Sequence, residues 1–240
     1  MSECLPLLVL LPGMDGTGEQ FQELLQFFDK DIETMIVAYP REQQLSYLQL
    51  ETLVRGHLPR DRRFVLLGES FSGPIAISLA SQKPPHLAGL ILCATFCRNP
   101  QPLLKHFYAC VDRISPRLIP RFVLERVMFG SHGNAQQKQS FFDSLYSVNP
   151  AVIQHRCKEV LKLNYIDQLK SIETPVLYLQ GEHDYLVTRR YGSELQQHLQ
   201  DFRIQAFPTA HMLLQTQPQS AARAISQFMR ESLYRIQERN

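Results

Sequence analysis

The stretch that decides the fold is Arg63–Gly73, RFVLLGESFSG. Its first residues form an apolar run typical of a buried strand, and Pro74–Gln82, rich in alanine and isoleucine, has the pattern of a helix. Ser70 therefore stands at a sharp turn between strand and helix, with Gly68 two positions before it and Ser72 two positions after it. Small residues at these places let strand and helix approach, so that the serine side chain is presented above the sheet. Taken alone, the turn is equally compatible with a tight connection that has no chemistry.

Outside this stretch, apolar runs alternate with helical patterns through the first half of the chain and again near its end. Strands are predicted at Leu5–Leu11, Ile32–Tyr39, Leu87–Thr95, Pro175–Gln180 and Phe202–Phe207, in addition to Arg63–Leu67. Helices are predicted at Gly18–Phe28, Leu45–Leu58, Tyr191–Leu199 and Gln219–Ile236. Nearly continuous apolar strands indicate a parallel sheet that is covered on both faces. We therefore expect an α/β fold with a doubly wound sheet of about six parallel strands.

The middle of the chain, residues 98–172, has a different pattern. It contains no strand-like run, only amphipathic helical stretches interrupted by proline and glycine. We predict a helical cap there, inserted into a core made of residues 1–97 and 173–240. The cap holds 11 basic and 5 acidic residues, a net charge of +6, whereas the core holds 14 basic and 18 acidic residues, a net charge of −4. A solvated helix face explains this excess, and so does attraction to an anionic substrate or lipid surface.

Composition excludes several classes of protein. The chain has 240 residues, which is too long for a disulfide-stapled miniprotein, and it is 44% hydrophobic, which is too apolar for a disordered chain. Its net charge of +2 implies no nucleic-acid partner. The five cysteines show no CxxC pair and no metal-ligand spacing, so free thiols and no metal or cofactor are expected. Leu5–Leu11 lacks the flanks of a signal peptide, and no segment is long enough to span a bilayer. We expect a cytoplasmic protein, of an oligomeric state that the sequence does not predict.

Two further polar residues follow the strands that come after the middle block. A serine hydroxyl is a weak nucleophile unless a histidine accepts its proton and an acid orients that histidine. In a sheet of this kind the acid follows a later strand and the histidine follows the next one. Asp184 in GEHD and His211 in PTAH stand at these two places, so Ser70, Asp184 and His211 form the predicted triad. Their order makes a chance arrangement of three ordinary loop residues improbable.

The neighbours of these residues have simpler explanations. Glu182 is an alternative for the acid, two positions before Asp184. His183 precedes the last strand and is expected to be a loop residue rather than the base. Glu69 is expected to be a turn residue whose side chain is directed away from the site, with a minor part in tuning the site as the alternative.

An early glycine-rich loop supplies the last part of the chemistry. Acyl transfer needs backbone N–H groups for the developing oxyanion, one from the residue after the nucleophile and one from the loop after an early strand. Phe71 is the first of these donors. The loop Leu11–Gly18, LPGMDGTG, offers Met14 as the second, with Gly13 allowing the backbone to turn toward the site. A phosphate-binding interpretation fails, because the loop has neither G-K-[ST] nor G-x-G-x-x-G.

With LPGMDGTG, GESFSG and the later acid and histidine, the chain resembles the serine α/β-hydrolases over most of its length outside 98–172. The resemblance assigns the family's nucleophile, acid, base and two backbone donors to Ser70, Asp184, His211, Met14 and Phe71, respectively. The chain departs from the family in having Ser72 at the place of a glycine and LPG where many relatives have HG. We also expect it to lack the two antiparallel edge strands of the fuller fold. A narrower resemblance is to ester synthases and acyl-processing hydrolases.

The resemblance implies a cofactor-independent serine hydrolase that cleaves a carboxylic ester or thioester through an acyl-enzyme on Ser70. An acyltransferase would use the same triad with an alcohol or thiol in place of water, and so would a carbon–carbon bond hydrolase or a perhydrolase. A non-catalytic ligand-binding module on the same fold is a further alternative. The expected partner is a small acyl ester or thioester, with an anionic group as one option. In the cap, packing or the lining of an acyl pocket is expected of Phe107, Tyr108, Phe122, Val123, Val127, Met128 and Phe129.

Overall fold

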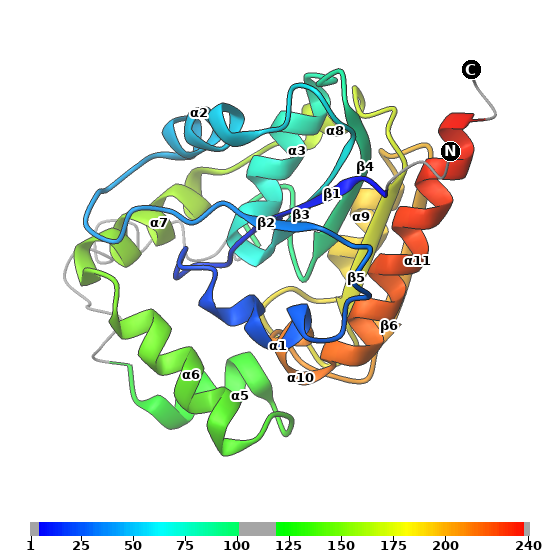
Figure 1. The fold of residues 1–240 in the computed structure, drawn as a ribbon. Coiled ribbons are helices and arrows are strands. Elements are labelled where there is room, and N and C mark those ends of the chain that lie inside the picture. Colours follow the sequence, from blue (N-terminus) through cyan, green and yellow to red (C-terminus); the bar gives the residue numbers. More distant parts are fainter. Residues whose placement is uncertain (1–4, 101–118, 238–240) are drawn as a thin grey trace.

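One parallel sheet organises the molecule (Figure 1), which a computed structural model describes for residues 5–100 and 119–237. Its strands are β1 (Leu7–Leu11), β2 (Thr34–Ile36), β3 (Phe64–Glu69), β4 (Leu87–Cys93), β5 (Val176–Gly181) and β6 (Phe202–Phe207). They lie in the order β2-β1-β3-β4-β5-β6, and every pair is parallel. The expected doubly wound α/β sheet of six parallel strands is confirmed. The chain reverses its direction across the sheet between β1 and β3, and the carboxyl ends of strands at such a reversal form a crevice for ligands.

Each face of the sheet packs against its own layer of helices. In β1 the side chains alternate, so that Leu7, Val9 and Leu11 face one layer and Leu8 and Leu10 face the other. The first layer contains α2 (Tyr47–His57), α3 (Gly73–Ser81), α8 (Ile166–Leu169) and α9 (Arg190–Gln196). The second contains η1 (Glu19–Phe21), α1 (Gln22–Leu25), α10 (Leu213–Thr216) and the long α11 (Pro218–Gln237). Burial on both sides explains why the strand sequences are almost continuously apolar.

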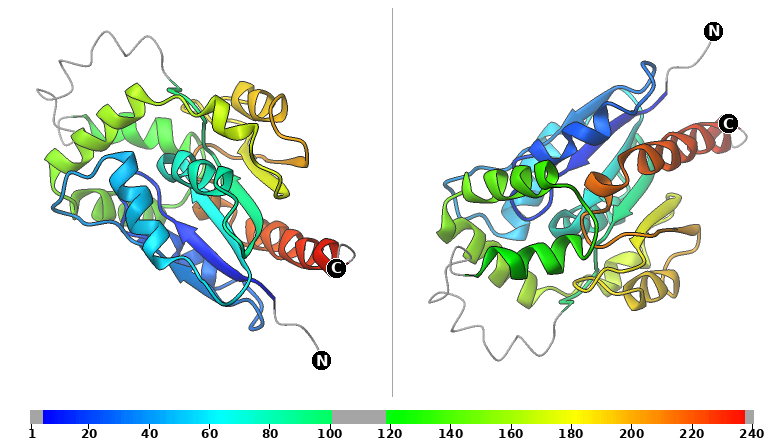
Figure 2. Two further views of the ribbon diagram at one scale, coloured as in Figure 1. Left: turned by 90° about the horizontal axis from the view of Figure 1, so that it is seen from above. Right: turned by 90° about the horizontal axis from the view of Figure 1, so that it is seen from below.

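A group of helices between β4 and β5 lies beyond one end of the sheet. It consists of α5 (Arg121–Phe129), α6 (Ala135–Tyr146) and α7 (Pro150–Lys162), and both views of Figure 2 show it away from the C-terminal end of α11. Asn134 caps α6 in a capping box with Gln137, and Asn149 followed by proline begins α7. These helices share a small apolar cluster, Leu145, Val148, Val152 and Ile153, which Met14 of the core also joins. We call α5, α6 and α7 the cap helices.

The remaining part of 98–172 packs differently. Leu169 of α8 and Ile172 after it are buried in the same cluster as α2 and α3, on the first face of the sheet. The division into core and cap at residues 98 and 172 therefore stays a prediction, and the cap helices are the part that stands over the end of the sheet.

Several element boundaries differ from those predicted. The run Ile32–Tyr39 contributes only Thr34–Ile36 to the sheet, because β2 is an edge strand paired with β1 alone. The predicted helix Gly18–Phe28 is a short 3-10 turn followed by four residues of α1. Strand β3 continues through Gly68 to Glu69, which places the Ser70 turn directly at its end. Of the helices that the structure describes, none combines the length and apolar character needed to cross a membrane.

Candidate active site

Ser70 occupies a strained turn at the carboxyl end of β3. The 3-10 turn η2 (Ser70–Ser72) joins the strand directly to α3, and Ser70 has φ of +47°, a left-handed conformation that residues other than glycine seldom adopt. A Cβ on Gly68 would lie 2.8 Å from the Ser72 carbonyl oxygen, and one on Gly73 would lie 2.0 Å from Oγ1 of Thr95. The Thr95 hydroxyl donates a hydrogen bond to the Ser70 carbonyl. The close approach of strand and helix therefore requires these glycines and fixes the serine.

Ser72, which stands where many relatives have glycine, has a role of its own. Its side chain is fully buried, and its hydroxyl donates to the carbonyl of Pro12. It also lies 2.6 Å from the hydroxyl of Tyr39, which donates in turn. The residue is small enough for the turn, and its hydroxyl connects the turn to the loop after β1.

The three residues of the predicted triad lie in one hydrogen-bonded chain. Oγ of Ser70 is 2.8 Å from Nε2 of His211, and Nδ1 of His211 is 2.7 Å from Oδ2 of Asp184. The other carboxylate oxygen of Asp184 accepts hydrogen bonds of 2.8 Å from the backbone N–H groups of Leu186 and Val187. Those two amides hold the carboxylate in place, so it can orient the imidazole.

Burial and charge tune the two ionisable groups beside Ser70. Desolvation alone would lower the pKa of His211, but the Asp184 carboxylate raises it, and the net pKa lies above its ordinary value. Glu69 is the last residue of β3 and is also buried. Desolvation raises the pKa of Glu69 to about 7, although a 2.9 Å hydrogen bond from Nε2 of Gln215 opposes this rise.

The loop after β1 passes beside the nucleophile. A Cβ on Gly13 would lie 4.0 Å from the Cβ of Ser70. Met14, the next residue, lines a cavity that Ser70 also lines. Phe71 lies in the first turn of the helix that begins at Ser70, where backbone N–H groups have no acceptor within the helix. Tyr47 fixes Phe71, because its ring stacks on the Phe71 ring at 4.8 Å and its hydroxyl donates to the Phe71 carbonyl. Met14 and Phe71, whose backbone N–H groups are the predicted oxyanion donors, thus both lie close to Ser70.

A cavity of about 730 Å³ opens between this site and the cap helices. Its ionisable lining residues, within the part of the chain that the structure describes, are Asp15, Glu69, Cys157 and His211, with no lysine or arginine. The rest of its wall is mainly apolar and comes from both core and cap: Met14, Ile119, Leu124, Val127, Met128, Phe141, Leu145, Ile153, Leu161, Leu186 and Met212. Such a wall suits an apolar ligand group that lies next to Ser70.

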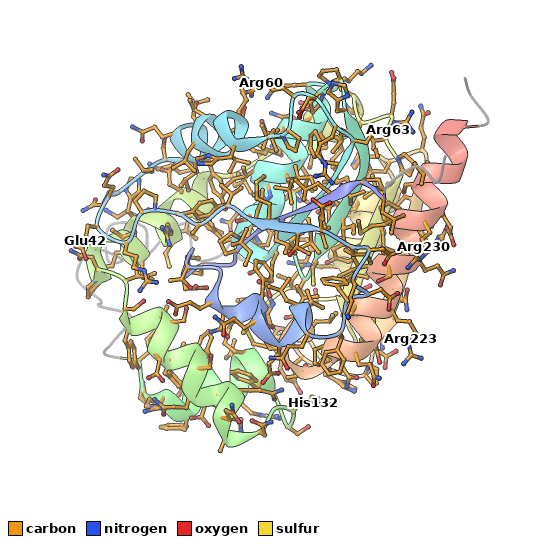
Figure 3. All side chains as sticks on the ribbon, in the orientation of Figure 1. Glu42, Arg60, Arg63, His132, Arg223 and Arg230 are labelled. Atoms are coloured by element: carbon orange, nitrogen blue, oxygen red, sulfur yellow. The ribbon has the colours of Figure 1, made fainter. Side chains whose placement is uncertain are left out.

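The alternatives for the acid and base are not part of this chain of hydrogen bonds. Glu182 pairs with Arg189 at 3.4 Å and is only half-buried. The ring of His183 stacks on that of His132 from the α5–α6 connection, with centroids 5.8 Å apart; Figure 3 labels His132. The expectation that the Glu69 side chain is directed away from the site is wrong: it is buried and lines the cavity, because β3 extends two residues further than predicted.

The residues singled out in the cap have different surroundings. Val127 and Met128 line the cavity and Phe129 is buried, whereas Phe122 is 73% exposed and Val123 is exposed as well. Phe107 and Tyr108 lie outside the described residues.

Sequence reasoning missed Arg156, which is buried and contacts the loop after β1. A signal was present: Val152, Arg156 and Val160 follow one another at intervals of four, which places an arginine on the apolar face of a helix. For a metal, the described part of the chain offers no group of three or more His, Cys, Asp or Glu side chains.

Comparison with known proteins agrees with this fold. A family model described as "Serine aminopeptidase, S33" matches residues 48–217. Comparison with curated proteins gave no match. Among solved structures, an enol-lactonase from Burkholderia xenovorans LB400 superposes with a TM-score of 0.81 at 16% identity, covering 94% of this chain and 91% of that one. A lipase-esterase related protein from Clostridium acetobutylicum ATCC 824 gives 0.79 at 16% identity, covering 93% and 94%. A hydrolase from Pseudomonas aeruginosa PA01 gives 0.79 at 19% identity, covering 94% and 90%.

Proposed function

Because the chain belongs to the serine α/β-hydrolase family, in the branch described by the serine aminopeptidase model, we propose that it cleaves a carboxylic ester or thioester with a large apolar acyl group. The observation that carries this proposal is the hydrogen-bonded chain from Asp184 through His211 to Ser70, which ends on the wall of an apolar cavity.

The proposed reaction uses side chains and backbone amides only. Nε2 of His211 takes the proton of the Ser70 hydroxyl while Oγ attacks the acyl carbonyl carbon. Asp184 keeps the proton on Nδ1 and stabilises the imidazolium, and the N–H groups of Met14 and Phe71 donate hydrogen bonds to the carbonyl oxygen on which negative charge develops. The bond to the alcohol or thiol then breaks, and that leaving group receives the proton from His211. Water, deprotonated by His211, attacks the acyl-enzyme and releases the acid, and the proton returns to Ser70.

Two acidic residues in the cavity raise the alternative of a peptidase that binds an amino terminus. The Asp15 carboxylate, however, is already engaged by the Thr17 N–H at 2.9 Å and the Ser144 hydroxyl at 2.7 Å. Glu69, with a pKa of about 7, is only partly ionised near neutral pH. These residues support an ester with a neutral acyl group better than a charged amine.

The positive charge of the cap bears on the leaving group of the substrate rather than on its acyl group. Arg121 and Arg126 are exposed on α5, whereas the described cavity wall has no basic side chain other than His211. We therefore place an anionic group, where the substrate carries one, on the leaving group outside the cavity.

A panel of esters and thioesters tests the proposal. With neutral leaving groups, we expect kcat/KM to rise from acetyl toward longer acyl chains, because each buried CH2 contributes about 0.8 kcal/mol. Acetyl as the preferred group, or cleavage of aminoacyl amides in preference to esters, would contradict it. For anionic leaving groups, we expect the rate to depend on ionic strength and to fall in Arg121→Gln and Arg126→Gln. Unchanged rates would show that the cap charge does not attract the substrate.

Two controls distinguish ester hydrolysis from acyl transfer and from ligand binding without turnover. Added alcohols should not divert most of the acyl group from water; if they do, the protein is an acyltransferase. A fluorophosphonate probe should label Ser70, and a folded protein that is never labelled would indicate a binding module.

A further inference from the structure

A buried arginine connects the cap helices to the loop that holds Met14. Arg156 lies on α7 and is 1% exposed. Its Nη1 donates to the carbonyl oxygens of Met14 and Asp15, at 2.8 Å each, and its Nη2 donates to that of Pro40 at 3.1 Å. Burial lowers the pKa of this guanidinium, but an arginine keeps its charge in proteins. A full positive charge is therefore held among main-chain carbonyls, two of which belong to the loop with Met14.

The loop is shaped to receive this guanidinium. Gly16 has φ of +70°, and a Cβ there would lie 2.6 Å from Nη1 and 3.0 Å from Cζ of Arg156. The rings of Tyr39 and Phe71 flank the cation, at 5.6 and 5.9 Å from Cζ to their centroids. The backbone N–H of Tyr39 donates to the Gly16 carbonyl at 2.7 Å. The guanidinium of Arg156 is thus enclosed by residues from three segments near Ser70, namely Gly16, Tyr39 and Phe71.

The contacts of Arg156 concern the loop and not the substrate cavity. Its neighbours Ile153 and Cys157 line the cavity, whereas the guanidinium is directed to the carbonyls behind Met14. Fixing the carbonyls of Met14 and Asp15 holds the two planar peptide units on either side of Asp15. The second of these units carries the Gly16 N–H, which donates to the Gly13 carbonyl at 3.1 Å. The Gly13 carbonyl shares its planar peptide unit with the Met14 N–H, so Arg156 holds the direction of this N–H, and with it the proposed oxyanion site, through the Gly16 hydrogen bond.

We propose that Arg156 is a positioning residue for the oxyanion loop, so that the cap must be docked on the core for the transition state to be stabilised. The inference rests on the proposed function, since it assigns Arg156 a part in that same reaction. A substitution should then affect binding of the tetrahedral state more than binding of the substrate or the product acid. A residue that only stabilises the fold would affect all of these equally, through the fraction of folded protein.

The test compares Arg156→Met and Arg156→Lys with Lys162→Met, which removes an exposed basic side chain from the same helix. For a neutral ester with a long acyl chain, we expect Arg156→Met to lower kcat about 10- to 100-fold with little change in KM, as misplacement of an oxyanion donor does. It should weaken binding of a trifluoromethyl ketone, whose adduct carries an oxyanion, by a similar factor, and leave binding of the product acid unchanged. Arg156→Lys keeps the charge without the fork of donors and should recover only part of the loss. Lys162→Met should leave kcat unchanged.

The ratio of the two ligand affinities does not depend on how much of a variant is folded. An unchanged kcat for Arg156→Met, or an equal loss for ketone and product acid, would overturn the inference. If Arg156→Met does not fold, Arg156→Lys decides the matter by the same ratio. Failure of the proposed function would look different, because the wild-type protein would then turn over esters no faster than Ser70→Ala.

Discussion

The hydroxyl of Ser72 shows how a single atom connects two parts of the site. It bonds to Pro12 in the loop before Met14 and to the hydroxyl of Tyr39, whose ring flanks Arg156. A glycine at this position would satisfy the turn but not these two partners. The departure from the family pattern is therefore compensated within the same structure, which predicts that the turn and the loop move together.

Glu69 is the residue whose ionisation we expect to matter most for stability. Its folded-state pKa of about 7 lies above the ordinary value of 4.5, so the folded state holds the proton more tightly than the unfolded chain. The stability that this gives is fully present below about pH 4.5 and is lost as the pH rises through about 7.

Glu69→Gln removes this dependence, because an amide does not titrate. Relative to the wild type, the free energy of unfolding of Glu69→Gln should rise between pH 4.5 and pH 8 by up to about 3 kcal/mol. Urea unfolding of both proteins at the two pH values measures this difference. A difference that is constant with pH would show that Glu69 ionises normally in the folded protein.

At the scale of elements, the approach of α3 to β4 leaves no space for a side chain at Gly73. A Cβ there would lie 2.0 Å from Oγ1 and 2.4 Å from Cγ2 of Thr95, and Thr95 also holds the Ser70 carbonyl. Gly56 on α2 provides the contrast, because nothing lies within 4 Å of a Cβ built on it.

Gly73→Ala should lower the free energy of unfolding by about 1–3 kcal/mol or more, since the added methyl overpacks the contact with Thr95. Gly56→Ala should raise it by about 0.5–1 kcal/mol, because alanine is the better helix former. Thermal or urea unfolding of the two variants gives both values. If Gly73→Ala were as stable as the wild type, helix and strand would not approach as closely as described.

The elements differ in how well the sequence predicts them. Strands β1 and β3 to β5 are buried on both sides, so their apolar runs are unambiguous. Strand β2 has one neighbour and half-buried residues, and its ends depend on pairing that a local pattern does not contain. The short helix α10 depends likewise on tertiary contacts, with Leu213 and Leu214 packed against the second face of the sheet.

At the scale of the whole molecule, topology explains why the site was partly predictable. The reversal between β1 and β3 brings the loop with Met14 beside Ser70, and the ends of β5 and β6 bring Asp184 and His211 to the same edge. The order of these residues along the chain was therefore enough to propose the triad.

Charge was harder to interpret, because a net value does not say which way each side chain is directed. The cap segment sums to +6, yet Arg121 is exposed on its surface and Arg156 is buried against backbone carbonyls. Glu69 and Asp15 are hidden within the near-neutral total and place two carboxyl groups on the cavity wall. Only the packing of cap on core separates these roles.

The central claim is that Ser70 is the nucleophile of an ester hydrolase, and turnover of a long-chain ester by wild type and by folded Ser70→Ala tests it most directly. Loss of the nucleophile should lower kcat by at least about 10⁴-fold while the variant keeps the wild-type unfolding transition. A folded Ser70→Ala protein that hydrolyses the ester at the wild-type rate would contradict the account.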